Sequence, residues 1–375
     1  MVKDYFPLGI AVGTAHCNRR NERDSLANNI RQGRHTWLSA RRRMGKTSLV
    51  EQVSKDLARK RQSVVTVSVD LLVIHDAESL DIRLRHAVAE AAQQLLPKSQ
   101  RALVGLKKAF GALTPELTLG EDGFKIKLGR GTSTDQTIEM ALQGLDRVAG
   151  DKKRRVMFIC DEFQQLSSIK DHAVLEAAIR HAAERTKHVA FVFAGSERHL
   201  LADMFENPDR PLYQLCDRMT LERIAEADYK SFMTTASKSR WKKPISVEAI
   251  EKILALTLRH PYYVNALCGR LWDRPRPPSV DAVEKAWLIY VEDDKRRVAT
   301  RVLELSPAQR ALLAQIAREP TSHPASQEFL QKVRLPASTG VQAKQVLERE
   351  DLIQQDEHGV WELVDPVLAT ALKGL

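Results

Sequence analysis

A short run rich in basic residues, at positions 39–48, constrains the fold of this chain more than any other feature. It follows the apolar stretch 36–38, ends in Gly45-Lys46-Thr47-Ser48, and precedes a segment with helical character. A strand, a tight loop ending in Gly-Lys-Thr and a helix together form a phosphate-binding P-loop, or Walker A motif. The N–H groups of the loop and of the first helical turn point to one place, where the helix dipole favours an anion. The run therefore predicts a nucleotide phosphate site.

The predicted nucleotide contacts come from this loop and from the first turn of the helix. Lys46 is expected to reach the β- and γ-phosphates, and the Thr47 hydroxyl is expected to ligate Mg²⁺. Ala40 stands where the motif usually has its first glycine. Taken alone, Gly-Lys-Thr also fits a surface turn that enters a helix, so the context must decide. The predicted cofactor-binding residues are Arg42, Arg43, Met44, Gly45, Lys46, Thr47 and Ser48.

A second strand supplies that context. Five apolar residues in a row, 156–160, are typical of a strand buried on both faces of a parallel sheet. Asp161 and Glu162 follow at its carboxyl end, where open α/β sheets bind ligands. Asp161 is predicted to hold Mg²⁺, directly or through water, and Glu162 to polarise the attacking water as the catalytic residue of a Walker B strand. Two solvated acids are the alternative, and the P-loop upstream favours the nucleotide site.

The next apolar strand, 189–194, ends in Gly195-Ser196. Ser196 is predicted to position the lytic water against the γ-phosphate, and a simple turn is the alternative. Two further apolar stretches, 63–70 and 219–221, complete a predicted five-strand parallel sheet.

Length and composition limit the class of protein. A chain of 375 residues predicts two or three domains, and 43% apolar with 28% charged residues is typical of a globular protein. A formal charge of +10 fits a polyanionic partner, and it also fits a solvated basic surface. Four scattered cysteines argue against a zinc site and favour a reducing compartment. No apolar stretch approaches the ~20 residues that span a bilayer, and the N-terminal segment is a poor signal peptide. We therefore expect a cytoplasmic protein without membrane contact.

The pattern along the chain predicts three domains. Residues 1–224 alternate strands and helices, with a β-hairpin insertion near 115–131. Lys125, Lys127 and Arg130 suit a finger that contacts DNA or a partner, and a surface flap is the alternative. Residues 225–302 show only helical stretches and are predicted to form a lid domain. Residues 303–375 carry three helices and a hairpin, the pattern of a winged helix, in which Ser306 caps the first helix.

These motifs in this order resemble the AAA+ and STAND-type P-loop ATPases, specifically the archaeal-type ATPase group. The family's Arg-x-x-Glu-x-x-x-Leu entry is matched by Arg19, Glu22 and Leu26, and its Asp-Glu-Phe-Gln strand end by residues 161–164. The resemblance implies a P-loop NTPase sheet with a helical lid and a C-terminal winged helix. It also implies ATP and Mg²⁺ as cofactors and a slow ATPase activity.

Two further site residues come from the resemblance. The family's Gly-x-Pro aligns with 259–261 and implies that Pro261 packs near the adenine, although Arg259 replaces the glycine. AAA+ proteins commonly complete the site with an arginine from a neighbouring subunit, which implies a homo-oligomer. Arg218, expected just before the last core strand, is the first candidate and Arg210 the second. Pairing with nearby acids on a solvated loop is the alternative for both.

Two classes of function remain open. In the first, the chain is an ATP-controlled switch that oligomerises with nucleotide and associates with DNA. The recognition helix of its winged helix would then carry Ser338, Thr339, Gln342 and Lys344. In the second, it is a STAND-like signalling or defence ATPase whose winged helix docks a partner protein. Acidic residues near the end of the same helix support this second class.

Overall fold

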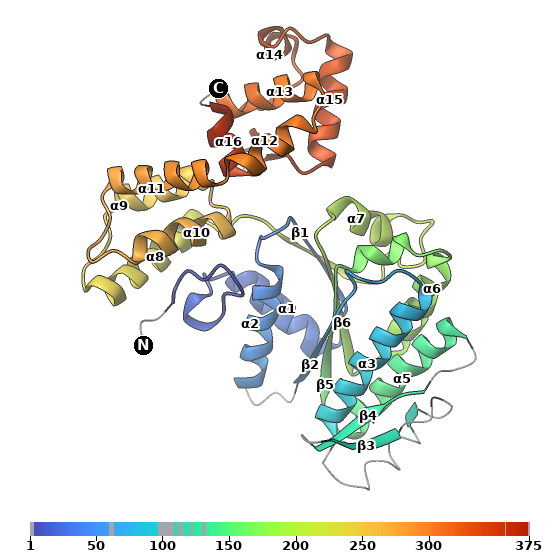
Figure 1. The fold of residues 1–375 in the computed structure, drawn as a ribbon. Coiled ribbons are helices and arrows are strands. Elements are labelled where there is room, and N and C mark those ends of the chain that lie inside the picture. Colours follow the sequence, from blue (N-terminus) through green and yellow to red (C-terminus); the bar gives the residue numbers. More distant parts are fainter. Residues whose placement is uncertain are drawn as a thin grey trace. The chain divides into compact units, whose positions relative to one another are not determined.

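The computed structural model describes residues 4–59, 64–96, 109–110, 113, 116–120, 123–129, 133–356 and 358–373. The chain divides into two compact units (Figure 1). One, here called the sheet unit, runs from Arg19 to Glu222. The other, here called the helical unit, combines the residues up to Asn18 with those from Arg223 onward.

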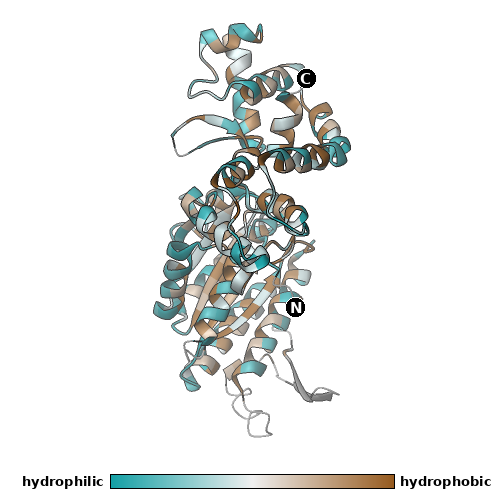
Figure 2. Ribbon diagram, turned by 90° about the vertical axis from the view of Figure 1, so that its left-hand side faces the viewer, coloured by the Kyte–Doolittle hydropathy of each residue, from teal (hydrophilic) through white to brown (hydrophobic). Residues whose placement is uncertain are grey.

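The sheet unit is built on five parallel strands. Their bounds are β1 Thr36–Ala40, β2 Val64–Asp70, β5 Arg155–Asp161, β6 Val189–Gly195 and β7 Asp217–Leu221. They pair in the order β2-β5-β6-β1-β7, so β1, which leads into the P-loop, lies between β6 and β7. Figure 2 shows the strands mostly in brown, as expected for strands buried on both faces. The predicted five-strand parallel sheet is confirmed.

Helices cover both faces of this sheet (Figure 1). Their bounds are α1 Arg20–Gln32, α2 Lys46–Arg59, α3 Ala77–Leu95, α5 Thr134–Asp151, α6 His172–Arg185 and α7 Arg198–Glu206, with a 3-10 helix η3 at Phe163–Ser168. Successive strand residues point to opposite faces. Thus Leu38 joins the core under α1 and α2, whereas Trp37 joins the core under α3, α5, α6 and α7.

A β-hairpin interrupts the alternation between α3 and α5. Strands β3 Glu116–Gly120 and β4 Gly123–Lys127 pair in antiparallel fashion, which confirms the hairpin expected near 115–131. The turn 121–122 and Arg130 lie outside the described residues. For β3 and β4 the described part is the backbone, so the roles of Lys125 and Lys127 stay predictions.

The helical unit is almost entirely α-helical. Its elements are η1 Gly13–Ala15, α8 Glu226–Trp241, α9 Val247–Leu256, α10 Pro261–Trp272, α11 Val280–Asp293, α12 Lys295–Leu303, α13 Pro307–Arg318, α14 Gln327–Lys332, α15 Ala337–Arg349, β8 Ile353–Gln355, β9 Trp361–Leu363 and α16 Pro366–Lys373. One hydrophobic core extends from Tyr5 to Leu372 and draws on both predicted segments, 225–302 and 303–375. The N-terminal Phe6 contributes to it through edge-on ring contacts with Phe232 and Trp272.

Two features of the helical unit differ from the sequence prediction. Within the helical segment predicted for 225–302, the break at Asp294 between α11 and α12 was not expected. Arg297 in α12 donates to Asp294 and to Asp365, a residue beyond the hairpin, so tertiary contacts stabilise the break. A last helix, α16, was not expected.

The C-terminal elements follow the predicted order of three helices and a hairpin. Ser306 caps α13 by accepting from the Gln309 N–H, and the Gln309 side chain accepts from the Ser306 N–H in return. The strands β8 and β9 pair in antiparallel fashion. Within the described ranges, none of the helices combines the length and the apolar character that crossing a membrane requires.

Candidate functional site

The predicted P-loop connects β1 to α2 as expected. Ala40, fully buried, is the last residue of β1, so the substituted glycine of the motif belongs to the strand and not to the turn. Gly45 has φ = +90°, a conformation that residues with a side chain rarely adopt. Arg43, also at positive φ, and Arg42 are exposed. The loop is therefore compatible with the Ala40 substitution and depends on Gly45.

Buried hydrogen bonds hold this loop from the protein side. The Arg19 guanidinium, 5% exposed, donates to the Met44 carbonyl at 3.0 Å and to the Glu222 carbonyl at 2.8 Å. It also pairs with Glu22 at 3.0 Å. The Met44 side chain is buried, and its N–H donates to the Arg41 carbonyl, so Met44 anchors the loop. Arg19 matches a family motif in the sequence, but its hydrogen bonds to the P-loop were not predicted.

The amino end of α2 carries the residues predicted to hold phosphate. Lys46 opens the helix and is 9% exposed, whereas Thr47 is exposed and Ser48 is half-buried. The first-turn N–H groups of a helix lack partners within the helix, and the dipole places positive charge there. This helix end can therefore accept an anion, with the Lys46 ammonium beside it.

The two predicted acids lie opposite Lys46. Asp161 ends β5, and Glu162 follows in the left-handed region at φ = +49°. The Lys46 Nζ lies 3.7 Å from Glu162 Oε1. Burial lowers the pKa of Lys46, and the charges of Glu162 and Asp161 oppose that change. Burial also raises the pKa of Asp161, with Lys46 opposing it. Asp161 is thus a half-buried carboxylate whose charge is only partly compensated, and a cation would stabilise it.

Ser196 contacts Glu162, which the sequence did not predict, and its expected role toward the lytic water stays a prediction. Glu162 Oε2 accepts from the Ser196 N–H at 3.2 Å and from the Ser196 hydroxyl at 2.8 Å. It also accepts from Gln164 Nε2 at 2.6 Å. Burial alone would raise the pKa of Glu162, but the Gln164 bond, the Lys46 charge and the Ser196 bonds together hold the pKa below its ordinary value. Glu162 is therefore a carboxylate at neutral pH.

A third carboxylate belongs to this edge of the sheet and was missed. Asp70 ends β2 and stands opposite Asp161 in the parallel register. The signal was present in the sequence, because both strands end in an aspartate. Across the described residues, no group of three or more His, Cys, Asp or Glu side chains is arranged to hold a metal ion by itself. Mg²⁺ commonly takes one or two carboxylates and completes its shell with phosphate and water, so Asp161 and Thr47 fit this ion.

The two candidate arginines lie elsewhere in the sheet unit. Arg218 is inside β7, opposite Trp37 in the register and one residue before the level of Asp161. Strand β7 is three strands away from β5, so roughly 14 Å of sheet separates the two residues. It pairs with Glu206 at 2.7 Å and lies over the Trp37 ring. Arg210 is bound inside the fold by Asp203, Ser167 and the buried Glu176. The alternative for both arginines was pairing with a nearby acid, Asp217 for Arg218 and Asp209 for Arg210, and their ion pairs are instead with Glu206 and with Asp203 and Glu176.

Pro261 belongs to the helical unit, where it opens α10. The preceding turn places Arg259 at φ = +56°, the region that the family's glycine would adopt without strain. The backbone conformation that a glycine favours is thus kept despite the substitution. The contact of Pro261 with adenine stays a prediction.

Comparisons with known proteins agree with this fold. No protein-family model matches the chain, and no curated protein matches its sequence. A Walker-type ATPase of Pyrococcus abyssi is similar in structure, with a TM-score of 0.64 at 16% identity over 98% of this chain and 99% of that chain. The ORC2 protein of Aeropyrum pernix, in ADPNP–ADP complexes, has a TM-score of 0.56 at 15% identity over 95% of this chain and 92% of that chain. The chain therefore has the P-loop NTPase α/β fold, as its resemblance to archaeal-type ATPases predicted.

Proposed function

We propose that this protein binds ATP with Mg²⁺ and hydrolyses it. The observation that carries the proposal is the meeting of Lys46, at the amino end of α2, with the carboxylates at the end of β5. Phosphoryl transfer to water requires three parts: a cation that binds phosphate, oxygen ligands for a divalent metal, and an ionised glutamate. The fold shared with Walker-type ATPases supports the same proposal.

Each residue has a distinct task in this proposal. Lys46 and the first-turn N–H groups of α2 hold the β- and γ-phosphates. Thr47 and Asp161 hold Mg²⁺, which supplies charge neutralisation at the phosphates when bound. Glu162 accepts a proton from water as the water oxygen bonds to the γ-phosphorus and ADP leaves. Ser196 holds the Glu162 carboxylate in place.

The proposal is tested with ATP and the full chain. Wild type should bind ATP and release phosphate, Lys46→Ala should lose binding, and Glu162→Gln should bind but turn over ~10²- to 10⁴-fold more slowly. Lys55→Ala, an exposed lysine of the same helix, is the matched control for charge. Unchanged ATP affinity in Lys46→Ala would refute the P-loop assignment.

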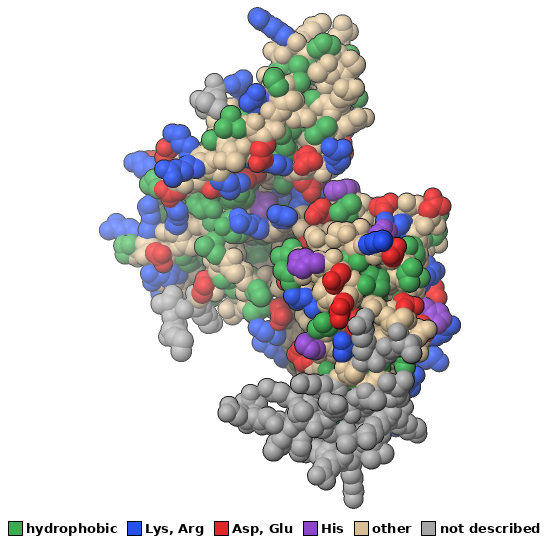
Figure 3. All heavy atoms as spheres, turned by 45° about the vertical axis from the view of Figure 1, so that its right-hand side comes forward, with side chains coloured by type: hydrophobic (Ala, Val, Ile, Leu, Met, Phe, Trp, Pro, Cys, Tyr) green, Lys and Arg blue, Asp and Glu red, His purple; other side chains and the backbone are tan. Residues whose placement is uncertain are grey.

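For the C-terminal elements we propose a winged helix that associates with DNA. The exposed face of α15 presents Ser338, Gln342 and Gln345, whose side chains can bond base edges or phosphates. Exposed Arg349 adds a cation near the end of this helix. Figure 3 shows Lys and Arg beside Asp and Glu on the same face of the molecule, so the net charge of +10 by itself supports DNA binding only weakly.

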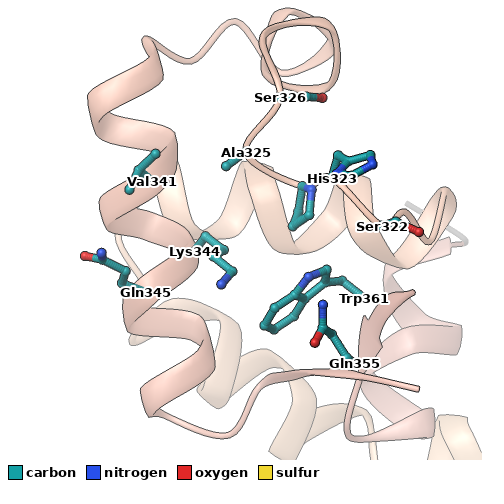
Figure 4. A pocket seen from close by; sticks show the side chains of 10 residues that line it. Ser322, His323, Ala325, Ser326, Val341, Lys344, Gln345, Gln355 and Trp361 are labelled. Carbon is teal, nitrogen blue, oxygen red and sulfur yellow. The ribbon is translucent and has the colours of Figure 1, made fainter. Parts of the chain in front are cut away.

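A protein partner is the second candidate, and one observation favours it. A pocket of about 520 Å³ opens between α15, β8, β9 and the segment before α14 (Figure 4). Lys344, expected to be free for DNA, lies over the Trp361 ring at 4.0 Å and pairs with Glu348 at 2.8 Å. The pocket is therefore lined by an engaged cation and an aromatic ring, which suits a protein side chain more than a phosphate backbone.

Salt dependence separates the two candidates. DNA binding by the full chain should weaken steeply with salt, because each phosphate contact releases counterions. Gln342→Glu should weaken it further, and Gln315→Glu, on α13, serves as the control. Binding that is absent at low salt, or insensitive to Gln342→Glu, would leave the docking of a partner protein as the proposal.

We also propose that the protein forms a homo-oligomer with ATP. The half-exposed Arg218 is the candidate for a cation that acts on a neighbour's γ-phosphate. Size measurement with and without ATP, on wild type and Glu162→Gln, tests the assembly itself.

A further inference from the structure

Gln164 is a buried polar side chain beside the proposed catalytic residue. It is 2% exposed and lies at the start of η3, two residues after Glu162. Its Nε2 donates to Glu162 Oε2 at 2.6 Å. A carboxylate only accepts hydrogen bonds, so the amide nitrogen must face Glu162 and the amide oxygen must point away.

The opposite side of the Gln164 amide is closed by the end of β6. A Cβ on Gly195 would lie 2.0 Å from Gln164 Oε1 and 2.8 Å from Leu201 Cδ1. The glycine therefore provides the space that the amide fills. Gln164 Oε1 is buried and has no hydrogen-bond partner among the described residues. Burying an unpaired acceptor is unfavourable, so stability alone does not explain why an amide occupies this place.

The contacts of Glu162 divide between its two oxygens. Oε2 receives Gln164 and both donors of Ser196, whereas Oε1 faces Lys46. Donors that reach one carboxylate oxygen from two directions fix the rotation of the Glu162 carboxylate group. The other oxygen therefore stays turned toward the P-loop. Ser196 directly follows β6 and Gln164 lies in η3, so the two side chains approach Glu162 from different elements and each restricts a different tilt of the carboxylate.

We infer that Gln164 is a positioning residue that fixes the Glu162 carboxylate with Oε1 toward the P-loop, ready to accept the proton of water. The inference rests on the proposed ATP hydrolysis and adds a residue to it. Gln164 touches neither phosphate nor metal in this scheme and acts through Glu162. The alternative is that Gln164 only fills space between η3 and Gly195.

Gln164→Met separates these alternatives because methionine has nearly the same shape, lacks the donor and removes the unpaired oxygen. Positioning predicts a chain as stable as wild type, with kcat roughly 10- to 100-fold lower and KM for ATP nearly unchanged. Gln164→Glu, which replaces the donor by a second carboxylate, should lose turnover in the same way. Gln165→Glu, the same change one residue later on a half-buried side chain, should behave as wild type.

A double-mutant cycle completes the test. In a Glu162→Gln background, Gln164→Met should cause no further loss of turnover, because the residue it positions is already gone. Wild-type kcat in Gln164→Met, or a loss that adds to that of Glu162→Gln, overturns the inference while the ATPase proposal stands. A wild type that releases no phosphate from ATP overturns both.

Discussion

The Lys46 ammonium and the Glu162 carboxylate face each other at 3.7 Å across the end of the sheet. The pair joins the first residue of α2 to the residue after β5. Both groups have tasks toward ATP in the proposed function, and each is engaged by the other here. A phosphate that draws Lys46 toward the P-loop must therefore compete with Glu162.

We expect Glu162→Gln to bind ATP more tightly than wild type. The change removes the competing charge and a repulsion of the phosphates, and a gain of about 1 kcal/mol corresponds to roughly fivefold in Kd. Fluorescent ATP titration measures it, with Glu90→Gln, an exposed glutamate of α3, as the control. Equal or weaker affinity would mean that Lys46 reaches phosphate without leaving Glu162.

Arg19→Lys should weaken ATP binding although Arg19 is not a predicted ATP contact. A lysine keeps the charge but cannot donate to the Met44 and Glu222 carbonyls and Glu22 together, as the planar guanidinium does. We expect a loss of about 1–3 kcal/mol in the free energy of unfolding. Urea unfolding and ATP titration measure the two effects. The exposed neighbour Arg20→Lys should leave both unchanged, and an unaffected Arg19→Lys would contradict the anchoring role.

Two glycines inside helices should respond to alanine in opposite directions. In α5, a Cβ on Gly144 would lie 2.4 Å from Phe110 Cδ1, so Gly144→Ala should lower the free energy of unfolding by about 1–3 kcal/mol. In α10, a Cβ on Gly269 meets only the Phe6 carbonyl at 3.7 Å. Gly269→Ala should therefore raise stability by about 0.5–1 kcal/mol. Denaturant titration of both variants gives the comparison, and equal signs would mean that helix propensity alone decides.

Changing Arg210 or Arg218 to alanine should affect different properties, stability for Arg210 and activity for Arg218. Arg210→Ala leaves the buried Glu176 without its guanidinium, so we expect a loss of about 3–5 kcal/mol in stability. Arg218→Ala breaks an exposed pair with Glu206 and should hardly change unfolding. If Arg218 acts on a neighbour, the specific ATPase activity should rise with protein concentration. Inactive Lys46→Ala subunits should then partly rescue the activity of Arg218→Ala subunits when the two are mixed. Flat activity without rescue would make Arg218 a surface residue.

The parts of the site that sequence reasoning found depend on local order along the chain. Lys46, Asp161 and Ser196 each follow a recognisable apolar strand, and parallel strands bring their carboxyl ends to one edge. Asp70 could have been found by the same rule, and its strand was recognised without using the residue that ends it.

Other contacts could not be predicted because they join distant segments. Arg19 meets the Glu222 carbonyl, and Arg210 meets Glu176, through tertiary packing that no periodicity encodes. The break at Asp294 likewise depends on Arg297 reaching Asp365. Nothing in the N-terminal segment itself indicates that Phe6 packs against Phe232 and Trp272.

The 2.8 Å bond from Arg19 to the Glu222 carbonyl brings the first and last residues of the sheet unit together. During synthesis, Phe6 leaves the ribosome long before its partners Phe232 and Trp272, because residues 19–222 come between them. Once the sheet unit folds, its two ends meet, and the loop that separates Phe6 from the later helices is already closed. Folding of the sheet unit has then already offset the entropic cost of closing that loop. Folding of the sheet unit thus prepares assembly of the helical unit.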